Sequence, residues 1–333
     1  MSEPSHDASG TASTRAAEQT AARESARAWA AANTFRQADF PAERLVELKR
    51  ETTVSVVIPS RQVADTIGLV VAECVALRDA GAVDDVIVVD ADSSDGSARI
   101  AADAGAEVHQ ESALVPELGS ALGKGDAMWR ALAVARGDIV VYVDSDSVGF
   151  DRDFVCGLTG PLLKNPELKL VKGAYRRPFS SGASSVPDGG GRVSELAARP
   201  LLNIFFPELS AVQQPLGGEI AGRRSALIDV GYFTGYGCEI QTLIDLYLRF
   251  GLTAIAQSDL GERINAHQPL HDLGSMAFAV SRAILSRVEG LDDSLGGDAT
   301  FLNYVEGEAR LRSAPLVERP PFATIASEVA RVA

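Results

Sequence analysis

Apolar and polar residues follow two alternating patterns between residues 54 and 291. Short runs rich in Val and Ile predict strands, and the stretches between them repeat apolar residues every three or four positions, as helices do. The strands are expected within residues 54–60, 84–97, 107–111, 138–144, 168–178 and 252–263. The helices are expected within residues 65–81, 98–106, 124–137, 193–209, 237–251 and 271–291. This alternation predicts an α/β fold, in which helices cover both faces of a mostly parallel sheet.

Three other segments lack this regular pattern. The first dozen residues are polar and are expected to be disordered, and the rest of the Ala-rich segment up to residue 34 is expected to form a marginal helix at most. Residues 180–192 are expected to form a Gly/Ser loop. The Pro- and Glu-rich tail from residue 306 is expected to pack on a partner or to remain mobile.

Charge and composition argue against several classes of protein. The formal net charge of -14 argues against a broad nucleic-acid-binding surface. Cys74, Cys156 and Cys238 are far apart and odd in number, which argues against a disulfide framework and fits a reducing cytoplasm. Neither a membrane span nor a signal peptide is expected, because no sufficiently long apolar run or basic N-terminal region is present.

Polar residues follow three of the predicted strands at the point where each strand ends. These ends are Pro59-Ser60-Arg61, Asp90-Ala91-Asp92 and Asp144-Ser145-Asp146. In an open parallel sheet, ligands bind outside the carboxyl ends of the strands. The agreement of three strand ends therefore predicts a ligand site at this edge of the sheet.

The carboxylates of Asp144 and Asp146 come directly after an apolar run. One hard carboxylate can hold Mg²⁺ or Mn²⁺, which bridges phosphates, while the other binds a hydroxyl group of the ligand. The alternative is a turn that caps the next helix. Asp90 and Asp92 also have two interpretations, since acids at this point bind ribose or a base in some folds and form Asx turns in others.

Lys124 lies between two glycines at the start of a predicted helix. A lysine at that point can reach a diphosphate, because glycines let the backbone approach the phosphates. The spacing of a P-loop is absent, and no G-x-G-x-x-G follows the first strand, so a nicotinamide-dependent dehydrogenase is not favoured.

Four cations, Lys172, Arg176, Arg177 and Arg192, gather around one loop of an acidic chain and suggest an anionic small substrate. Arg192 also stands at the start of a predicted helix, where free amides and a guanidinium suit a phosphate or a carboxylate. The alternative for this segment is a flexible loop between two lobes.

Glu239 and His267 have simple structural explanations as well as functional ones. A carboxylate at the start of a helix, such as Glu239, is often only favourable for the helix dipole. A lone histidine is more often structural than a ligand, although imidazole is an acceptable ligand for Mn²⁺ and could complete a site begun by Asp146.

Taken together, eight motifs resemble a known family. They are PSRQVADT, VVDADSSDG, GKGDAMWRAL, VDSDS, DGGGRVSEL, QPLGGE, GYGCEI and LGERINAHQPL. In this order, over roughly residues 35–290, they resemble actinobacterial glucosyl-3-phosphoglycerate synthases and the related mannosyl-3-phosphoglycerate synthases. The resemblance implies a GT-A fold and a retaining transfer of glucose or mannose from a nucleoside-diphosphate sugar to O2 of D-3-phosphoglycerate. It also implies a Mg²⁺ or Mn²⁺ cofactor, a homodimer, and a role in compatible-solute or polysaccharide-precursor synthesis.

The resemblance also divides the chain and implies roles for individual residues. The implied regions are a tail over residues 1–34, a nucleotide-sugar-binding core over 35–178, an acceptor-binding region over 179–305 and a tail over 306–333. The residues implied to bind the donor are Pro59, Ser60, Arg61, Asp90, Asp92, Lys124, Asp144 and Ser145. Those implied to bind the acceptor are Gly191, Arg192, Ser194, Tyr236, Arg263 and Asn265. Asp144, Glu239 and the backbone of Leu216 would lie near the donor sugar as catalytic residues, and Asp146 and His267 would hold the metal, with Asn265 competing for the second position.

One motif departs from the glucosyl enzymes. They commonly carry P-A-L-N-E-E after the first strand, whereas this chain has Pro59-Ser60-Arg61-Gln62-Val63-Ala64, as in the mannosyl branch. The nucleotide base, uracil or guanine, therefore stays open. Two alternative functions also stay open: a GT-A transferase with a different acceptor, and a non-catalytic nucleotide-binding protein.

Retention of configuration permits two mechanisms. A carboxylate, Glu239 or Asp144, could act as a nucleophile and form a covalent intermediate. The mechanism that we expect is a same-face attack without such an intermediate, in which an oxygen of the leaving phosphate helps to deprotonate the acceptor hydroxyl.

Overall fold

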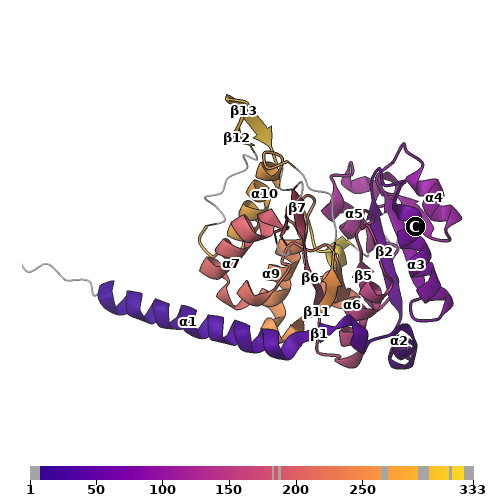
Figure 1. The fold of residues 1–333 in the computed structure, drawn as a ribbon, viewed down its shortest axis with the longest axis horizontal. Coiled ribbons are helices and arrows are strands. Elements are labelled where there is room, and N and C mark those ends of the chain that lie inside the picture. The colour runs from indigo at the N-terminus through magenta and orange to yellow at the C-terminus, as the bar shows by residue number, and fades with distance from the viewer. Residues whose placement is uncertain are drawn as a thin grey trace, which may run out of the picture.

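A computed structural model describes residues 8–181, 184–186, 189–263, 269–291, 300–314 and 317–325. The described chain is built around an eight-stranded sheet with the order β1-β11-β6-β9-β5-β2-β3-β4 (Figure 1). The strands are β1 (Thr34–Arg36), β2 (Val54–Ser60), β3 (Asp85–Asp90), β4 (Glu107–Gln110), β5 (Ile139–Tyr142), β6 (Leu170–Arg176), β9 (Ile220–Arg223) and β11 (Ile255–Glu262). All neighbours pair in parallel except β9, which runs antiparallel to β5 and β6. The predicted mostly parallel α/β sheet is confirmed.

Helices pack on both faces of this sheet. They are α1 (Ala8–Asn33), α2 (Ala42–Lys49), α3 (Ile67–Asp79), α4 (Ser97–Asp103), α5 (Lys124–Ala131), α6 (Asp153–Lys164), α7 (Arg199–Phe205), α8 (Arg224–Leu227), α9 (Cys238–Phe250) and α10 (Leu273–Leu285). A π-helical turn (Ser194–Ala198) leads directly into α7. Helices α3 and α9 end just before Gly81 and Gly251, whose positive φ angles of 81° and 78° favour glycine.

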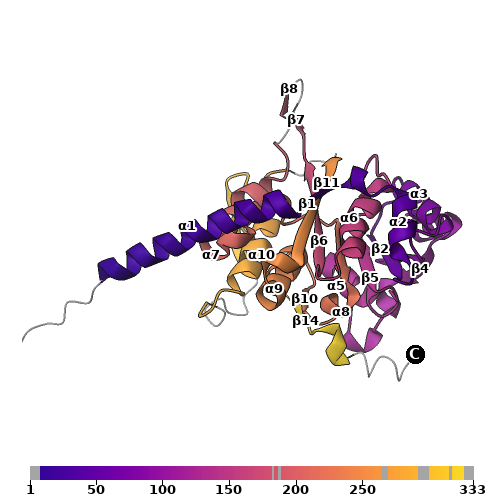
Figure 2. The same cartoon turned by 90° about the horizontal axis from the view of Figure 1, so that it is seen from below.

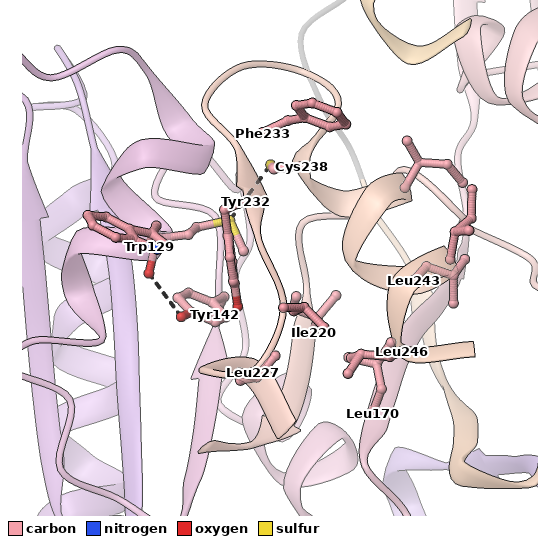
Figure 3. Packing of buried hydrophobic residues seen from close by; sticks show 14 of the residues in the cluster. Trp129, Tyr142, Leu170, Ile220, Leu227, Tyr232, Phe233, Cys238, Leu243 and Leu246 are labelled. Carbon is pink, nitrogen blue, oxygen red and sulfur yellow. Dashed lines mark hydrogen bonds between the residues drawn. The ribbon is translucent and has the colours of Figure 1, made fainter. Parts of the chain in front are cut away.

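Alternation along the strands divides the buried side chains between two cores. In β2, Val57 belongs to a core that includes Trp129 and residues of α9 and α10, whereas Val56 and Ile58 belong to a core under α3 and α6. Figure 3 shows part of the first core, where the hydroxyl of Tyr142 donates to the backbone oxygen of Met128 at 3.0 Å. The sheet therefore lies between two apolar cores, one on each of its faces.

Strands β1 and β9 were not predicted from the sequence. β9 has four residues, one of them Gly222, so it carries almost no β-type signal of its own. β9 is stabilised instead by tertiary contacts, because it lies between β5 and β6 and pairs with both strands. In the segment expected to be a loop, two short strands, β7 (Phe179–Ser181) and β8 (Ser184–Val186), pair with each other.

The N-terminal segment is more ordered than the sequence indicated. Helix α1 begins at Ala8, within the dozen residues expected to be disordered, and extends away from the body of the molecule (Figures 1 and 2). Its many alanines explain the local preference. Its last turns are anchored: Ala26 and Trp29 are buried, and Trp29 Nε1 donates to the backbone oxygen of Ile255 at 2.8 Å. The helix expected in the later part of the segment is thus present, and it begins earlier than expected, at Ala8.

The C-terminal segment also packs on the chain itself. Strands β12 (Thr300–Val305) and β13 (Glu308–Ser313) form a hairpin, and β14 (Glu318–Arg319) pairs with β10 (Tyr232–Phe233). The buried Arg319 donates to both carboxylate oxygens of Asp126 at 2.8 and 2.9 Å, and the ring of Phe322 lies 5.4 Å from that of Trp129. The expectation of a tail that is mobile or packs on a partner is thus wrong for residues 317–322.

The helices of the described residues offer no candidate for crossing a lipid bilayer, since none combines the necessary length with apolar character. Cys74, Cys156 and Cys238 are buried free thiols.

The Asp126–Arg319 pair predicts a measurable role for the C-terminal segment. Replacing Arg319 with Ala leaves the fully buried Asp126 with Arg130 as its remaining ion-pair partner, at 3.2 Å. We expect a loss of about 2–4 kcal/mol in the free energy of unfolding, because a buried charge that loses a partner is costly. Urea unfolding followed by circular dichroism measures the loss. Arg310→Ala removes an exposed pair with Glu308 and should cost less than about 0.5 kcal/mol; equal losses in the two variants would contradict the prediction.

Candidate functional site

A cleft of about 1040 Å³ lies at the carboxyl ends of the parallel strands. It brings together the three strand ends that the sequence singled out, together with segments from the second half of the chain. The predicted residues that line it are Pro59, Ser60, Arg61, Asp92, Lys124, Asp144, Ser145, Asp146, Gly191, Arg192, Ser194, Leu216, Tyr236, Glu239 and Arg263. Asp90 lies next to the cleft without lining it, and Asn265 and His267 fall outside the residues that the structure describes.

Lys124 forms the centre of the charged part of the cleft. It is the first residue of α5, and its Nζ lies 2.5 Å from Asp144 Oδ1 and 2.9 Å from Glu239 Oε1. The backbone of Gly218 passes so close that a Cβ atom there would lie 2.3 Å from both Asp144 Oδ1 and Lys124 Nζ. The loop before β9 can therefore approach this ion cluster only because it carries glycine.

Arg263 completes the cluster from the end of β11. Its Nη2 donates to Asp144 Oδ2 at 2.9 Å and lies 3.4 Å from Asp146 Oδ1, while its Nη1 pairs with the buried Glu219. Burial alone would raise the pKa of Asp144, but Lys124 and Arg263 outweigh burial and hold that pKa well below its usual range. Asp144 is therefore a carboxylate that stays ionised, with a cation on each oxygen.

Asp146 is in a different position from Asp144. Its side chain is 64% exposed, compared with 17% for Asp144, and its contact with Arg263 is longer. It is thus the carboxylate of this strand end that remains open to the cleft, and its oxygen atoms suit a hard divalent cation. Within the described ranges, no group of three or more His, Cys, Asp and Glu side chains forms a metal site, so further ligands would have to come from elsewhere.

Asp90 and Asp92 have separate roles. Asp90 is fully buried and accepts hydrogen bonds from Ser60 Oγ at 3.0 Å and from the amide of Ser93 at 2.8 Å. It therefore links the end of β2 to the turn after β3. Asp92 has a positive φ of 51°, accepts a hydrogen bond from Ser112 at 3.0 Å, and lines the cleft.

Glu111 also lines this end of the cleft, and sequence reasoning did not find it. It is almost fully buried, with no hydrogen-bond partner for Oε1 among the described residues, and burial raises its pKa to about 7. A carboxylate after a four-residue strand gives no signal that distinguishes it from a surface residue.

Two of the four cations that the sequence singled out line the cleft. Arg177 and Arg192 line it, beside Gly190 and Gly191. Arg176 points outward and is exposed. Of the four cations that the sequence places near one loop, Arg176 therefore does not face the cleft.

Lys172 lies beneath the cleft rather than in it. Its Nζ donates to the backbone oxygen of Gly217 at 2.7 Å, and burial lowers its pKa to about 8. It supports the loop that carries Leu216 and does not contact the cleft directly. Strand periodicity alone does not show whether a lysine on β6 faces a ligand or a loop.

Two buried residues, Glu219 and Tyr175, were also missed. Tyr175 donates to Glu219 Oε2 at 2.8 Å, and Glu219 pairs with Arg263. There was a weak indication in the sequence that Glu219 belongs to the site, because this carboxylate follows two glycines and directly precedes a short apolar run.

Comparison with known proteins shows which family the chain belongs to. A family model described as glycosyl transferase family 2 matches residues 55–183. The glucosyl-3-phosphoglycerate synthase of Mycolicibacterium smegmatis is 41% identical over 297 residues, which are 89% of this chain and 98% of the relative. The synthase of the same name from Petrotoga mobilis is 40% identical, over 85% of this chain and 90% of the relative.

Solved structures give the same result for the fold. The mannosyl-3-phosphoglycerate synthase from Rubrobacter xylanophilus has a TM-score of 0.81 and 43% identity, covering 90% of this chain and 98% of that one. The glucosyl-3-phosphoglycerate synthase from Mycobacterium tuberculosis was solved in complex with Mn²⁺, UDP-glucose and phosphoglyceric acid. It has a TM-score of 0.77 and 38% identity, and the match covers 86% of this chain and 95% of that one.

These matches confirm both the GT-A fold and the resemblance on which the assignments rested. The agreement extends over nearly the full length of the relatives, well beyond the segment matched by the family model. The chain belongs to the glucosyl-3-phosphoglycerate synthase family of glycosyltransferases.

Proposed function

We propose that this protein transfers glucose, with retention of configuration, from a nucleoside-diphosphate sugar to O2 of D-3-phosphoglycerate. The observation that carries the proposal is the cleft, which holds an ion cluster and two further cations. Asp144, Lys124 and Glu239 meet near the strand ends where a nucleotide sugar binds in such folds, and the cations Arg177 and Arg192 line the same cleft. This arrangement suits a diphosphate-linked sugar facing a small anionic acceptor.

A divalent metal, Mg²⁺ or Mn²⁺, fits the proposed donor end. The open carboxylate of Asp146 would hold it, together with His267 or Asn265 from the segment that follows Arg263. The glucosyl-3-phosphoglycerate synthase from Mycobacterium tuberculosis binds Mn²⁺ with UDP-glucose, which supports this choice. When bound, the metal supplies positive charge for the diphosphate leaving group.

The residues of the chain would share the remaining tasks. Lys124 provides a fixed positive charge for the departing diphosphate, and it needs no rearrangement, since Asp144 and Glu239 already hold it in place. The Leu216 backbone and Glu239 line the space for the donor sugar. Pro59, Ser60 and Asp92 lie where the nucleoside would bind.

The geometry favours the mechanism without a covalent intermediate. Asp144 has a cation on each oxygen, and one oxygen of Glu239 is paired with Lys124. Such pairing lowers the nucleophilicity of a carboxylate. We infer that an oxygen of the leaving phosphate, rather than either carboxylate, receives the proton of the acceptor hydroxyl as it attacks.

A mannosyl transfer is the second candidate. It is favoured by the 43% identity to the mannosyl-3-phosphoglycerate synthase from Rubrobacter xylanophilus and by the Pro59-Ser60-Arg61 motif. The homodimer and the cytoplasmic location stay predictions under either candidate.

The assay for this proposal is the release of nucleoside diphosphate with Mg²⁺ or Mn²⁺. UDP-glucose, GDP-glucose and GDP-mannose are each offered with and without D-3-phosphoglycerate. We expect release that depends on D-3-phosphoglycerate, and the best donor identifies the sugar and the base. If no donor gives acceptor-dependent release, the proposed acceptor is wrong.

The assignment of Asp146 predicts the loss of metal-dependent turnover. We expect Asp146→Ala to lower kcat/KM by about 100-fold or more, because the metal would lose a charged ligand. The midpoint of a Mn²⁺ titration of activity should also move to higher concentration. Asp103→Ala removes an aspartate that is 71% exposed, outside the cleft, and serves as the matched control. A normal Mn²⁺ midpoint in Asp146→Ala would exclude Asp146 as a ligand.

The absence of a covalent intermediate can be tested by mass spectrometry. We expect no glycosyl adduct on Glu239 or Asp144 when the protein is incubated with a 2-fluoro-sugar nucleotide, which slows the breakdown of such adducts. We also expect Glu239→Gln to retain measurable turnover, since that residue lines the donor site without forming a bond to the sugar. An adduct on either carboxylate that D-3-phosphoglycerate discharges would disprove the same-face mechanism.

A further inference from the structure

The buried side chain of Tyr175 links Arg177 to Arg263 and Glu219. Its buried hydroxyl donates to Glu219 Oε2 at 2.8 Å and accepts from Arg177 Nη2 at 3.0 Å. The Nη1 of Arg263 approaches the same oxygen at 3.4 Å. Burial and the adjacent Glu219 raise the pKa of Tyr175 to about 12, so its hydroxyl keeps the proton that it donates.

The two arginines on this hydroxyl differ in how their charges are balanced. Arg263 is paired with Asp144, Asp146 and Glu219. Arg177, in contrast, has no carboxylate within 4.0 Å among the residues that the structure describes, and its Nε is buried without a hydrogen-bond partner there. A partly buried guanidinium without a counter-charge is costly unless an anion binds to it.

The position of Arg177 is fixed by the surrounding structure. Its guanidinium lies over the ring of Tyr175, 5.2 Å from the ring centre, in a cation–π contact. Its backbone oxygen accepts a hydrogen bond from the amide of Gly190 at 2.9 Å, and a Cβ atom on Gly190 would lie 2.7 Å from Arg177 Cβ. The glycine segment that leads to Arg192 is therefore held directly against Arg177.

We propose that Arg177 binds an anionic group of the acceptor and that Tyr175 is the residue that positions it. The proposal rests on the proposed function and adds a residue to the acceptor end that the sequence motifs did not assign. Because Tyr175 also contacts Arg263 and Glu219, the position of the acceptor's anion is set relative to the ion cluster at Asp144. A shared support of this kind fixes the distance between donor and acceptor, on which the rate of transfer depends.

The test compares three variants of the full-length protein in steady-state assays with both substrates varied. Arg177→Ala is expected to raise the KM for D-3-phosphoglycerate about 10- to 100-fold, as the loss of a charge-assisted hydrogen bond to a ligand would, and to leave the donor KM within about twofold. Arg177→Lys should recover part of this loss, since it keeps the charge. Tyr175→Phe should raise the acceptor KM by a smaller factor, about 3- to 10-fold, since it removes the hydrogen bonds of the hydroxyl with Arg177 and Glu219 but keeps the Arg177 guanidinium.

Arg176→Ala is the matched control, because Arg176 is the adjacent arginine but is exposed and does not line the cleft. Its kinetic constants should equal those of the wild type. Titration calorimetry with glycerol 3-phosphate, which lacks the carboxylate, then identifies the group bound. If Arg177→Ala weakens the binding of glycerol 3-phosphate by the same factor as it raises the KM for D-3-phosphoglycerate, Arg177 binds the phosphate. If the affinity for glycerol 3-phosphate is unchanged while the KM for D-3-phosphoglycerate is raised, Arg177 binds the carboxylate.

Failure of this inference can be distinguished from failure of the proposed function. If the wild type shows no release dependent on D-3-phosphoglycerate, the proposed acceptor is wrong. If the wild type is active and Arg177→Ala keeps the wild-type acceptor KM, the role of Arg177 is wrong while the function stands. A Tyr175→Phe variant that lowers kcat and raises both KM values equally would show a general structural role for Tyr175 instead of positioning.

Discussion

The pairing of Asp144 with two cations is the interaction on which the rest of the site depends. A carboxylate at the end of a buried strand keeps its charge only if cations contact it, and here Lys124 and Arg263 do so. Lys124 begins α5 and Arg263 directly follows β11, while Glu239 in α9 and Glu219 just before β9 add negative charges. The site therefore forms only when four distant parts of the chain are docked on the sheet, which ties its geometry to the stability of the whole fold.

Much of this arrangement could be predicted from local sequence. The Val- and Ile-rich strands, the glycines that end α3 and α9, and the three polar strand ends all carry their signal within a few residues. The topology of parallel sheets then places those ends side by side, and the cleft includes residues of all three. For this reason the sequence could indicate residues that the structure brings together in one cleft, whereas the roles assigned to those residues stay predictions.

The rest depends on contacts between residues that are far apart in the chain. β9 becomes a strand because β5 and β6 leave a gap for it, and Arg319 is buried because Asp126 requires a cation. Tyr175 and Glu219 acquire a role only through two arginines that approach from other segments. Hydrophobic periodicity does not indicate such long-range contacts, so the buried polar residues beneath the cleft and the packing of the two terminal segments were harder to predict.

The Asp126–Arg319 contact has a consequence for the order of events during protein synthesis. Lys124 begins α5, and Asp126, two residues later, is the carboxylate that pairs with Arg319, 193 residues further along the chain. A growing chain on the ribosome has made the whole central sheet before residue 319 leaves the exit tunnel. The support of the segment that positions Lys124 is thus completed only after residue 319 has been made, so a truncated product that stops before Arg319 would carry the cleft residues without that support.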